Sequence, residues 1–185
     1  MALRQIRQYG DDILKKKAKP VVNFDATLHG LLEDMWDTLR EHDGLGLAAP
    51  QVGLLRRVVV VELEEESYEI INPEVLESSG CEVRIEACLS VPNKQGNVER
   101  PTYIKIQAFD RNKNPFVIET DDEMLVTALC HEIDHLDGVL FLDKALKIQD
   151  RPPDEEPPKR KSGKRDTKQD TKNSNVISGE MAVGR

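Results

Sequence analysis

One segment of the chain, DDEMLVTALCHEIDHLDG (121–138), is apolar on most of the circumference of the helix that its pattern predicts. Asp121 or Asp122 can cap the start of this helix, and Gly138 can stop it. The apolar positions recur at three- and four-residue steps, and they are Met124, Leu125, Ala128, Leu129, Ile133 and Leu136. A helix that is apolar nearly all round lies buried, so the rest of the domain must be built around this one.

The same helix carries His131, Glu132 and His135 in the sequence HEIDH. With 3.6 residues per turn, the two histidines lie one turn apart on one face. Burial of unpaired polar groups costs roughly several kcal/mol, and a metal ion bound by both imidazoles would remove that cost. Glu132 would then stand beside the ion as a candidate general base.

Two histidines do not complete a catalytic metal site, and the sequence offers three possible sources of a third ligand. The pattern HExxHxxGxxH would need a histidine where this chain has Phe141. A glutamate from a downstream helix would be Glu155, which lies in PPDEEPP, where no helix can form. Upstream, Cys88 in EACLS (86–90) offers a thiolate, and a Cys/His/His set with one open position suits a hydrolytic metal centre. On spacing alone, Cys88 fits a buried structural cysteine as well.

The remaining pattern predicts one more long helix and a series of strands. Residues 25–44 read as a helix with Asp25 as its N-cap and with core positions at Leu28, Leu31, Leu32, Met35, Trp36 and Leu39. Five runs rich in β-branched residues predict strands, namely RVVVVEL (57–63), SYEIINPEVLE (67–77), CEVRIEACLSV (81–91), YIKIQAFD (103–110) and PFVIET (115–120). Short breaks between these runs favour antiparallel pairing. We therefore predict an α+β fold in which antiparallel strands pack around a central buried helix that carries HExxH.

The segment from residue 151 to residue 185 differs in composition from the rest of the chain. It has four prolines among its first eight residues, no aromatic residue, and 9 basic against 6 acidic side chains. Such a segment cannot bury enough apolar surface to offset its ordering entropy. We therefore expect a single catalytic domain over residues 1–150 and a disordered, charged C-terminal tail over residues 151–185.

The predicted domain is acidic. The whole chain has 26 basic and 34 acidic residues, so 17 and 28 of them fall within residues 1–150, a net charge of −11. This charge argues against DNA as a partner, and only the tail, with a net charge of +3, could contact RNA. No apolar run approaches the ~20 residues that span a bilayer, so no membrane partner is expected. The N-terminus lacks the apolar core of a signal peptide, and the three cysteines show no disulfide pattern, so we expect a cytoplasmic protein.

A further stretch, GLGLAAPQ (44–51), has the composition of a ligand-contacting loop. Its glycines let the backbone approach a ligand closely, and its last residue, Gln51, has an amide that can donate to an oxyanion. Together with EACLS (86–90) and HEIDH (131–135), in this order and at these distances, it resembles the three motifs of the peptide deformylase family.

The resemblance runs from about Arg4 to Ile148, and the opening LRQIRQYGDDILKKKA also looks like the start of bacterial members. One position departs from the family pattern, because the family's second motif is usually EGCLS and this chain has Ala87 in place of the glycine. If the position has β geometry, the added methyl group costs little. If it needs a positive φ or a close backbone approach, the substrate groove is altered.

The resemblance implies that Cys88, His131 and His135 hold one divalent metal ion with water in a fourth position. Iron(II) is the family's usual physiological metal, and zinc or nickel can take its place, because this ligand set binds all three. The implied reaction is hydrolysis of the formyl group from the N-terminal formylmethionine of newly made polypeptides in the bacterial cytoplasm, with release of formate.

The resemblance also implies the roles of the residues around the metal. Glu132 would be the general base, while the side-chain amide of Gln51 and the backbone N–H of Leu89 would meet the developing oxyanion. The nascent formylmethionyl peptide is the implied substrate, and contact of the basic tail with the ribosome is a further expectation.

Substrate-binding residues can be proposed beside these groups. Thr127 and Ala128 precede the first histidine by four and three residues, so their small side chains leave a slot for an unbranched methionine side chain. Leu45 would add an apolar wall, and Gly46 would offer backbone hydrogen bonds to an extended peptide. Arg100, in VERP, matches an arginine that the family places near the substrate pocket, although it could also be a plain surface charge.

Two other functions fit part of this pattern. A zinc peptidase shares HExxH but cleaves internal amide bonds and has no use for GLGLAAPQ. A non-catalytic relative that binds formyl peptides or ribosomes would be expected to lose the base first, and Glu132 is present.

Overall fold

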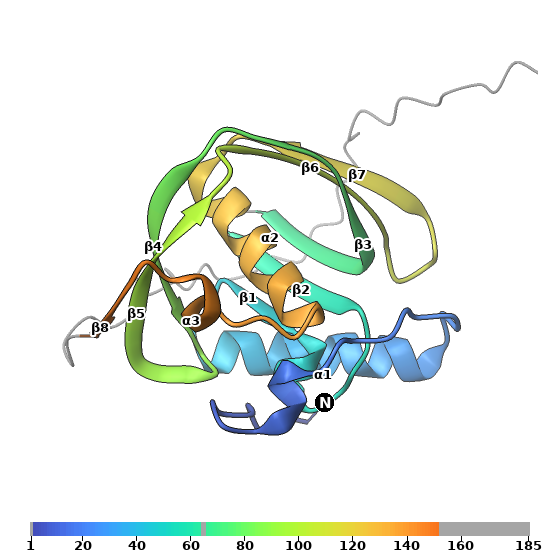
Figure 1. Ribbon diagram of the computed structural model, residues 1–185. Helices are drawn as coiled ribbons and strands as arrows, with labels where there is room; N and C mark the ends of the chain where they lie inside the picture. Colours follow the sequence, from blue (N-terminus) through green and yellow to red (C-terminus); the bar gives the residue numbers. More distant parts are fainter. Residues whose placement is uncertain (1, 64–65, 152–185) are drawn as a thin grey trace, which may run out of the picture.

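A computed structural model describes residues 2–63 and 66–151 and confirms the predicted α+β class (Figure 1). Its strands are β1 (Gly46–Ala48), β2 (Val58–Leu63), β3 (Glu66–Ser79), β4 (Glu82–Cys88), β5 (Val91–Arg100), β6 (Tyr103–Phe109), β7 (Pro115–Thr120) and β8 (Lys147–Asp150). Its helices are η1 (Asp12–Lys15), α1 (Ala26–Glu41), η2 (Ala49–Val52), α2 (Glu123–Leu136) and α3 (Phe141–Lys144). Apart from Arg151, the predicted tail lies outside the described residues, so the proposed domain boundary near residue 150 stays a prediction.

The described strands form two antiparallel sheets around the central helix. The larger sheet has the order β1-β2-β3-β6-β7, and the smaller has the order β4-β5-β8. Figure 1 shows α2 enclosed by the strands, with α1 on the far side of β1 and β2. An edge strand of each sheet, β1 and β4, lines a cavity together with residues of α2.

The run of four valines in β2 is buried on both faces because the strand is sandwiched between the two long helices. Val59 and Val61 belong to the core cluster that includes the α2 residues Leu125 and Leu129. The alternate residues Val58 and Val60 belong to the cluster formed with α1. This arrangement explains a continuous apolar run in an antiparallel sheet, where one face is more often exposed to solvent.

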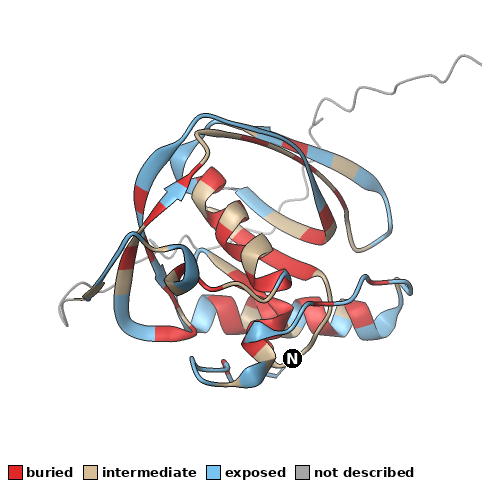
Figure 2. Cartoon of the chain, viewed as in Figure 1, coloured by how far each residue is buried: buried red, intermediate tan, exposed pale blue. Residues whose placement is uncertain are grey.

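Helix α1 begins where the sequence predicted and ends slightly earlier. The Asp25 side chain accepts hydrogen bonds from the backbone N–H groups of Thr27 and Leu28, as an N-cap does. The helix ends at Glu41 rather than at Gly44. All six predicted core positions are buried, along one side of the helix (Figure 2), and they are Leu28, Leu31, Leu32, Met35, Trp36 and Leu39.

Helix α2 has both of its predicted end signals. Asp122 is the N-cap and accepts from the backbone N–H of Leu125 at 2.8 Å. After the helix ends, Gly138 takes a φ of +74°, and a Cβ there would stand 2.6 Å from the carbonyl oxygen of Lys15. The prediction was wrong for Met124, which is 47% exposed because it lies on the side of the helix that faces a cavity.

The prediction also missed β5 and joined it in part to β4. The segment CEVRIEACLSV is broken after Cys88, where the pairing of β4 with β5 shifts register between Ala87 and Cys88. Strand β5 reads VPNKQGNVER, which is poor in β-branched residues. Its extended form is imposed by pairing with β4 on one side and β8 on the other. The periodicity of the sequence does not indicate which strands pair, so it could not predict β5.

The described helices include none that is long and apolar enough to cross a membrane.

A partly buried carboxylate ties α1 to the larger sheet. Glu69 of β3 accepts from the indole Nε1 of Trp36 at 2.8 Å and from the guanidinium of Arg111, with its Nε at 2.7 Å. Burial alone would raise the pKa of Glu69, but these hydrogen bonds outweigh it and lower the pKa below its ordinary value of 4.5. Because the folded protein holds Glu69 ionised more strongly than the unfolded chain does, this carboxylate stabilises the fold above the unfolded-state pKa.

We expect Glu69→Gln to lower the free energy of unfolding by about 1–3 kcal/mol at neutral pH, the usual size for a hydrogen bond to a charged group. The stabilisation by ionised Glu69 is lost as the pH falls below 4.5 toward the folded-state pKa, so the difference from wild type should shrink in acid. Urea unfolding at pH 7 and pH 4 measures both values. Glu33→Gln, which removes an exposed carboxylate from the same Arg111, is the matched control. A difference that grew on acidification would contradict this account.

Candidate metal centre

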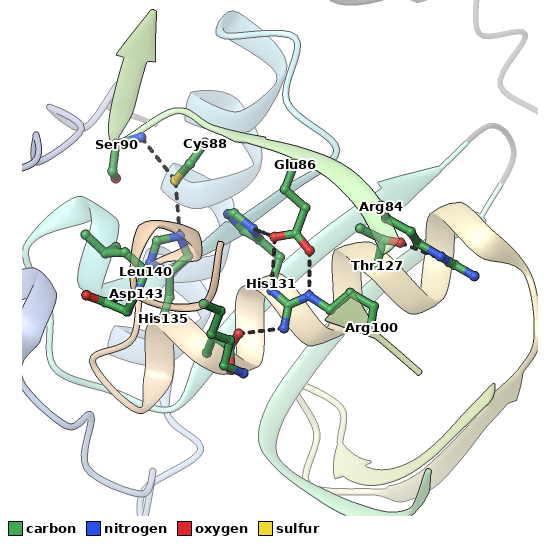
Figure 3. Close-up of polar contacts among 12 residues, drawn as sticks. Arg84, Glu86, Cys88, Ser90, Arg100, Thr127, His131, His135, Leu140 and Asp143 are labelled. Atoms are coloured by element: carbon green, nitrogen blue, oxygen red, sulfur yellow. Dashed lines mark hydrogen bonds and ion pairs between the residues drawn. The ribbon is translucent and has the colours of Figure 1, made fainter. Parts of the chain in front are cut away.

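The end of β4 and the C-terminal half of α2 bring together three side chains that could hold a metal ion. One ligand atom from each of Cys88, His131 and His135 lies within 4.8 Å of the other two. Cys88 Sγ lies 3.2 Å from His135 Nε2, and the two imidazole rings are 4.9 Å apart and nearly perpendicular. The helix therefore places its two histidines on one face, as the four-residue spacing predicted, and β4 supplies the third group (Figure 3).

A buried carboxylate fixes the orientation of His131. The Nδ1 atom of this ring is 2.8 Å from Glu86 Oε2, which leaves Nε2 as the nitrogen available to the ligand group. Arg100 donates to both oxygens of Glu86, at 2.5 and 3.0 Å, and to Asp134 Oδ2 at 2.7 Å. Burial would raise the pKa of Glu86, but the hydrogen bonds from Arg100 and His131 lower it to about 2, so this carboxylate stays ionised.

The three side chains fit a bound metal ion. Nitrogen and sulfur are ligands that zinc prefers, and the donor atoms of the three side chains all lie within 4.8 Å of one another, as in a group that could hold one ion. Burial lowers the pKa of His135 well below its ordinary value, so its ring is neutral and a lone pair is available. The buried Nδ1 of the same ring has no hydrogen-bond partner among the described residues. Cys88, His131 and His135 are therefore a group that can hold a metal ion.

Glu132 lies beside this group with an unused oxygen. Its side chain is buried, and Oε2 has no hydrogen-bond partner among the described residues. Burial raises the pKa of Glu132 to about 7. Gly46 makes room for it, because a Cβ on Gly46 would stand 2.7 Å from both Cγ and Oε1 of Glu132.

The amide of Gln51 has a defined orientation. Its Oε1 accepts from the backbone N–H of Ala48 at 2.7 Å, so the NH₂ group is turned the other way. It lies 3.6 Å from Cys88 Sγ and 3.3 Å from Ser90 Oγ. The amide can therefore present a donor at the ligand group.

A cavity of about 940 Å³ opens onto these residues. The predicted site residues that line it are Leu45, Gly46, Gln51, Cys88, Leu89, Thr127, Ala128, His131 and Glu132. Residues of the edge strands β1 and β4 stand on its walls together with the N-terminal half of α2. The described residues that line it do not include His135 and Arg100.

Arg100 is not among the described residues that line the cavity, and its role toward a substrate stays a prediction. It is only 3% exposed, and its guanidinium is occupied by Glu86 and Asp134. It holds Glu86, the carboxylate that contacts His131 Nδ1.

Glu86 is part of one of the three motifs, but no sequence pattern gives a role to Glu86 itself or to Asp134. A signal for Glu86 was present, because Arg84, Glu86 and Cys88 alternate along β4 and so share the buried face of the strand. The link from Asp134 through Arg100 to Glu86 joins α2, β5 and β4, and no local pattern contains it.

The alanine at position 87 is accommodated without strain. Ala87 lies in β4, is exposed, and is not among the described residues with a positive φ. Of the two alternatives, the structure therefore favours β geometry, in which the methyl group costs little.

Comparison with known proteins gives this site a family. Residues 3–151 match the family model of polypeptide deformylases. Peptide deformylase 1 of Clostridium acetobutylicum is 51% identical over 149 residues, which cover 80% of this chain and 99% of the relative. The peptide deformylase of Caldicellulosiruptor bescii is 52% identical over 148 residues, 80% of this chain and 89% of the relative.

A solved structure shows the same fold. The crystal structure of the peptide deformylase from Thermotoga maritima matches with a TM-score of 0.75 at 37% identity, over 80% of this chain and all of the other. The resemblance seen in three short motifs thus extends over the described domain and its Cys/His/His group. The chain belongs to the peptide deformylase family, metal-dependent hydrolases that remove the formyl group from nascent peptides.

Proposed function

We propose that this deformylase works with Cys88, His131 and His135 as metal ligands and Glu132 as general base. The observation that carries this assignment is the position of Glu132, a buried carboxylate with an unpartnered oxygen at the wall of the cavity, directly beside the ligand group. We propose iron(II) as the physiological metal, as is usual in the family. Zinc or nickel can replace it, because the affinity of such ligands does not favour iron and the availability of each metal decides which one is bound. We also propose that the enzyme acts in the bacterial cytoplasm.

A divalent ion held by these ligands would polarise the formyl group and lower the pKa of water. Glu132 takes a proton from the attacking water and returns it to the amine that leaves, so one carboxylate serves both halves of the reaction. Its pKa of about 7 in the buried site suits a group that must accept and release a proton near neutral pH. Formate and a free amino terminus are the products.

Two donors are proposed to meet the oxyanion as it develops. The NH₂ group of Gln51 is preorganised for this role, because the hydrogen bond from Ala48 fixes the direction of the amide. The backbone N–H of Leu89 is the second donor, on the loop that follows Cys88. Removing one donor of this kind typically costs about 10²–10³ in rate.

The substrate peptide is proposed to lie extended along the edge strands that line the cavity. Gly46 at the edge of β1 offers backbone groups, in the manner of strand addition, and Leu45 adds an apolar wall. Thr127 and Ala128 line the same cavity and leave the slot for the methionine side chain. Arg100 is proposed to support binding indirectly, through Glu86.

Paired variants separate the proposed base from a proposed ligand. We expect Glu132→Gln to keep its metal and to lose at least ~10² in turnover of a formyl-Met peptide, because the volume is kept and the base is removed. Cys88→Ser should lose or greatly weaken metal binding, because a protonated hydroxyl replaces a soft thiolate. Metal analysis and formate release measure both effects. Near-full activity of Glu132→Gln, or full metal occupancy of Cys88→Ser, would refute the respective role. Unformylated casein as substrate tests the rival peptidase activity.

The space at Gly46 gives a second test. We expect Gly46→Ala to reduce kcat by at least tenfold, because its Cβ would overlap Cγ and Oε1 of Glu132 and force the carboxylate away from its position. Gly30→Ala is the matched control, because a Cβ at Gly30 in α1 meets nothing within 4 Å, and alanine is the better helix former. Formyl-Met peptide kinetics and thermal unfolding of both variants give the answer. Equal kcat in Gly46→Ala and wild type would show that Glu132 does not need this space.

The tail is proposed to contact the ribosome without taking part in the chemistry. Arg151 is held by a hydrogen bond from its backbone N–H to the carbonyl oxygen of Asn93, so we place the truncation directly after it. The shortened chain should keep its turnover of a short formyl-Met peptide. Its co-sedimentation with ribosomes should fall below that of the full chain, and the difference should fade with salt as counterion release predicts. Loss of small-peptide turnover would refute the first expectation, and equal ribosome binding the second.

A further inference from the structure

Arg84 is an unexpected residue in the wall of a pocket proposed to hold a methionine side chain. It lies on the inward face of β4, at alternate positions with Glu86 and Cys88, and it is 6% exposed. It lines the cavity together with Thr127 and Ala128. A guanidinium at this place carries a full charge into a slot for which an apolar wall would suffice, and burial of a charge is costly.

The hydrogen bonds of Arg84 leave part of that cost uncompensated. Its Nη1 donates to the carbonyl oxygen of Glu123 and, at 3.0 Å, to Thr127 Oγ1 (Figure 3). Its Nη2 donates at 3.3 Å to Glu82, whose side chain is 58% exposed and is therefore a weak counter-charge. The buried Nε has no partner among the described residues.

The position along α2 places this charge at the far end of the methionine slot. Thr127 precedes the ligand His131 by four residues, which is about one helical turn, or roughly 5 Å along the axis. Arg84 contacts Thr127 on the side that leads away from the ligand group, toward Glu123. The tip of a side chain that enters the slot beside the ligand group therefore points toward the Arg84–Thr127 pair.

We propose that Arg84 is a specificity-determining residue that lets this enzyme deformylate peptides beginning with N-formylmethionine sulfoxide as well as N-formylmethionine. This inference rests on the proposed methionine slot. The thioether sulfur of methionine is a weak hydrogen-bond acceptor, and oxidation converts it into a polar, chiral sulfoxide. An apolar slot would reject that oxygen, because it would be buried without a donor. The Nη2 group of Arg84, which makes one 3.3 Å contact to the exposed Glu82, has a second N–H that can supply the donor.

Chirality separates this role from a purely structural one. Arg84 also joins β4 to α2 through Thr127 and Glu123, and loss of that link alone would affect both substrates alike. A donor fixed on one wall, in contrast, can reach the oxygen of only one sulfoxide epimer well. A preference between the two epimers is therefore the readout that a structural link would not produce.

The experiment compares kcat/KM for formyl-Met-Ala-Ser and for each separated epimer of its sulfoxide, using the metal-loaded full chain. We expect wild type to process one epimer within about tenfold of the thioether peptide and to prefer it clearly over the other. Arg84→Met should lose about ten- to hundredfold on that epimer relative to the thioether peptide, the usual range for a lost hydrogen bond to a charged group. Lys105→Met, which removes a cation from β6 at the Glu119 ion pair, is the control.

Each outcome is decisive. Wild type that processes the thioether peptide but is more than a hundredfold slower on both epimers overturns the proposal, and so does an unchanged epimer ratio in Arg84→Met. If wild type cannot process the thioether peptide, the proposed function itself fails, which is a different result. Should Arg84→Met not fold, Thr127→Val removes the hydroxyl that positions Nη1 and keeps the helix. It should lower the epimer ratio in the same direction, and an unchanged ratio there overturns the proposal.

Discussion

The structure depends on a series of ion pairs and hydrogen bonds between side chains that crosses its most apolar region. Helix α2 must be buried to close the core, yet it carries His131, Glu132 and His135 on one face. For His131, the contacts that run from Asp134 through Arg100 to Glu86 resolve this conflict, because each buried charge among them meets an opposite charge. This series of contacts starts and ends on α2 and passes through β5 and β4 of the smaller sheet. It therefore fixes that sheet to the helix close to Cys88 at the end of β4.

The orientation of His131 therefore depends on every buried charge in this series of contacts keeping its partner. A buried ion pair contributes little net stability relative to apolar packing, but removing one partner costs about 3–5 kcal/mol because the other charge is left buried and unpaired. Glu86 would be exposed to that penalty without Arg100, and its pKa of about 2 reflects how strongly the ionised form is held. These contacts orient the ring of His131, because the hydrogen bond between Nδ1 and Glu86 leaves Nε2 to face Cys88.

The parts of this molecule that were predictable are those written in local periodicity or in short motifs. The caps at Asp25 and Asp122, the buried face of α1 and the shared face of the two histidines all follow from helical spacing. The ligand group as a whole became recognisable only because three separated motifs resemble one family. Strand β5 and the role of Arg100 were not predictable in this way, because pairing partners and long-range ion pairs decide them. Met124 illustrates the same limit, since an apolar residue at a helical core position is exposed when the facing element leaves a cavity.

The cavity has a physical reason to accept an extended chain. Strands β1 and β4 are edge strands of different sheets, and both contribute residues to its walls. An open strand edge carries unpaired N–H and C=O groups and tends to recruit another strand, and β1 limits that hazard because it is only three residues long. A nascent peptide that lay between the two edges would satisfy backbone groups on both sides without any particular side chain. Selectivity would then be left to the proposed slot along α2, where the side chain of the first residue would meet Thr127, Ala128 and the charged end formed by Arg84.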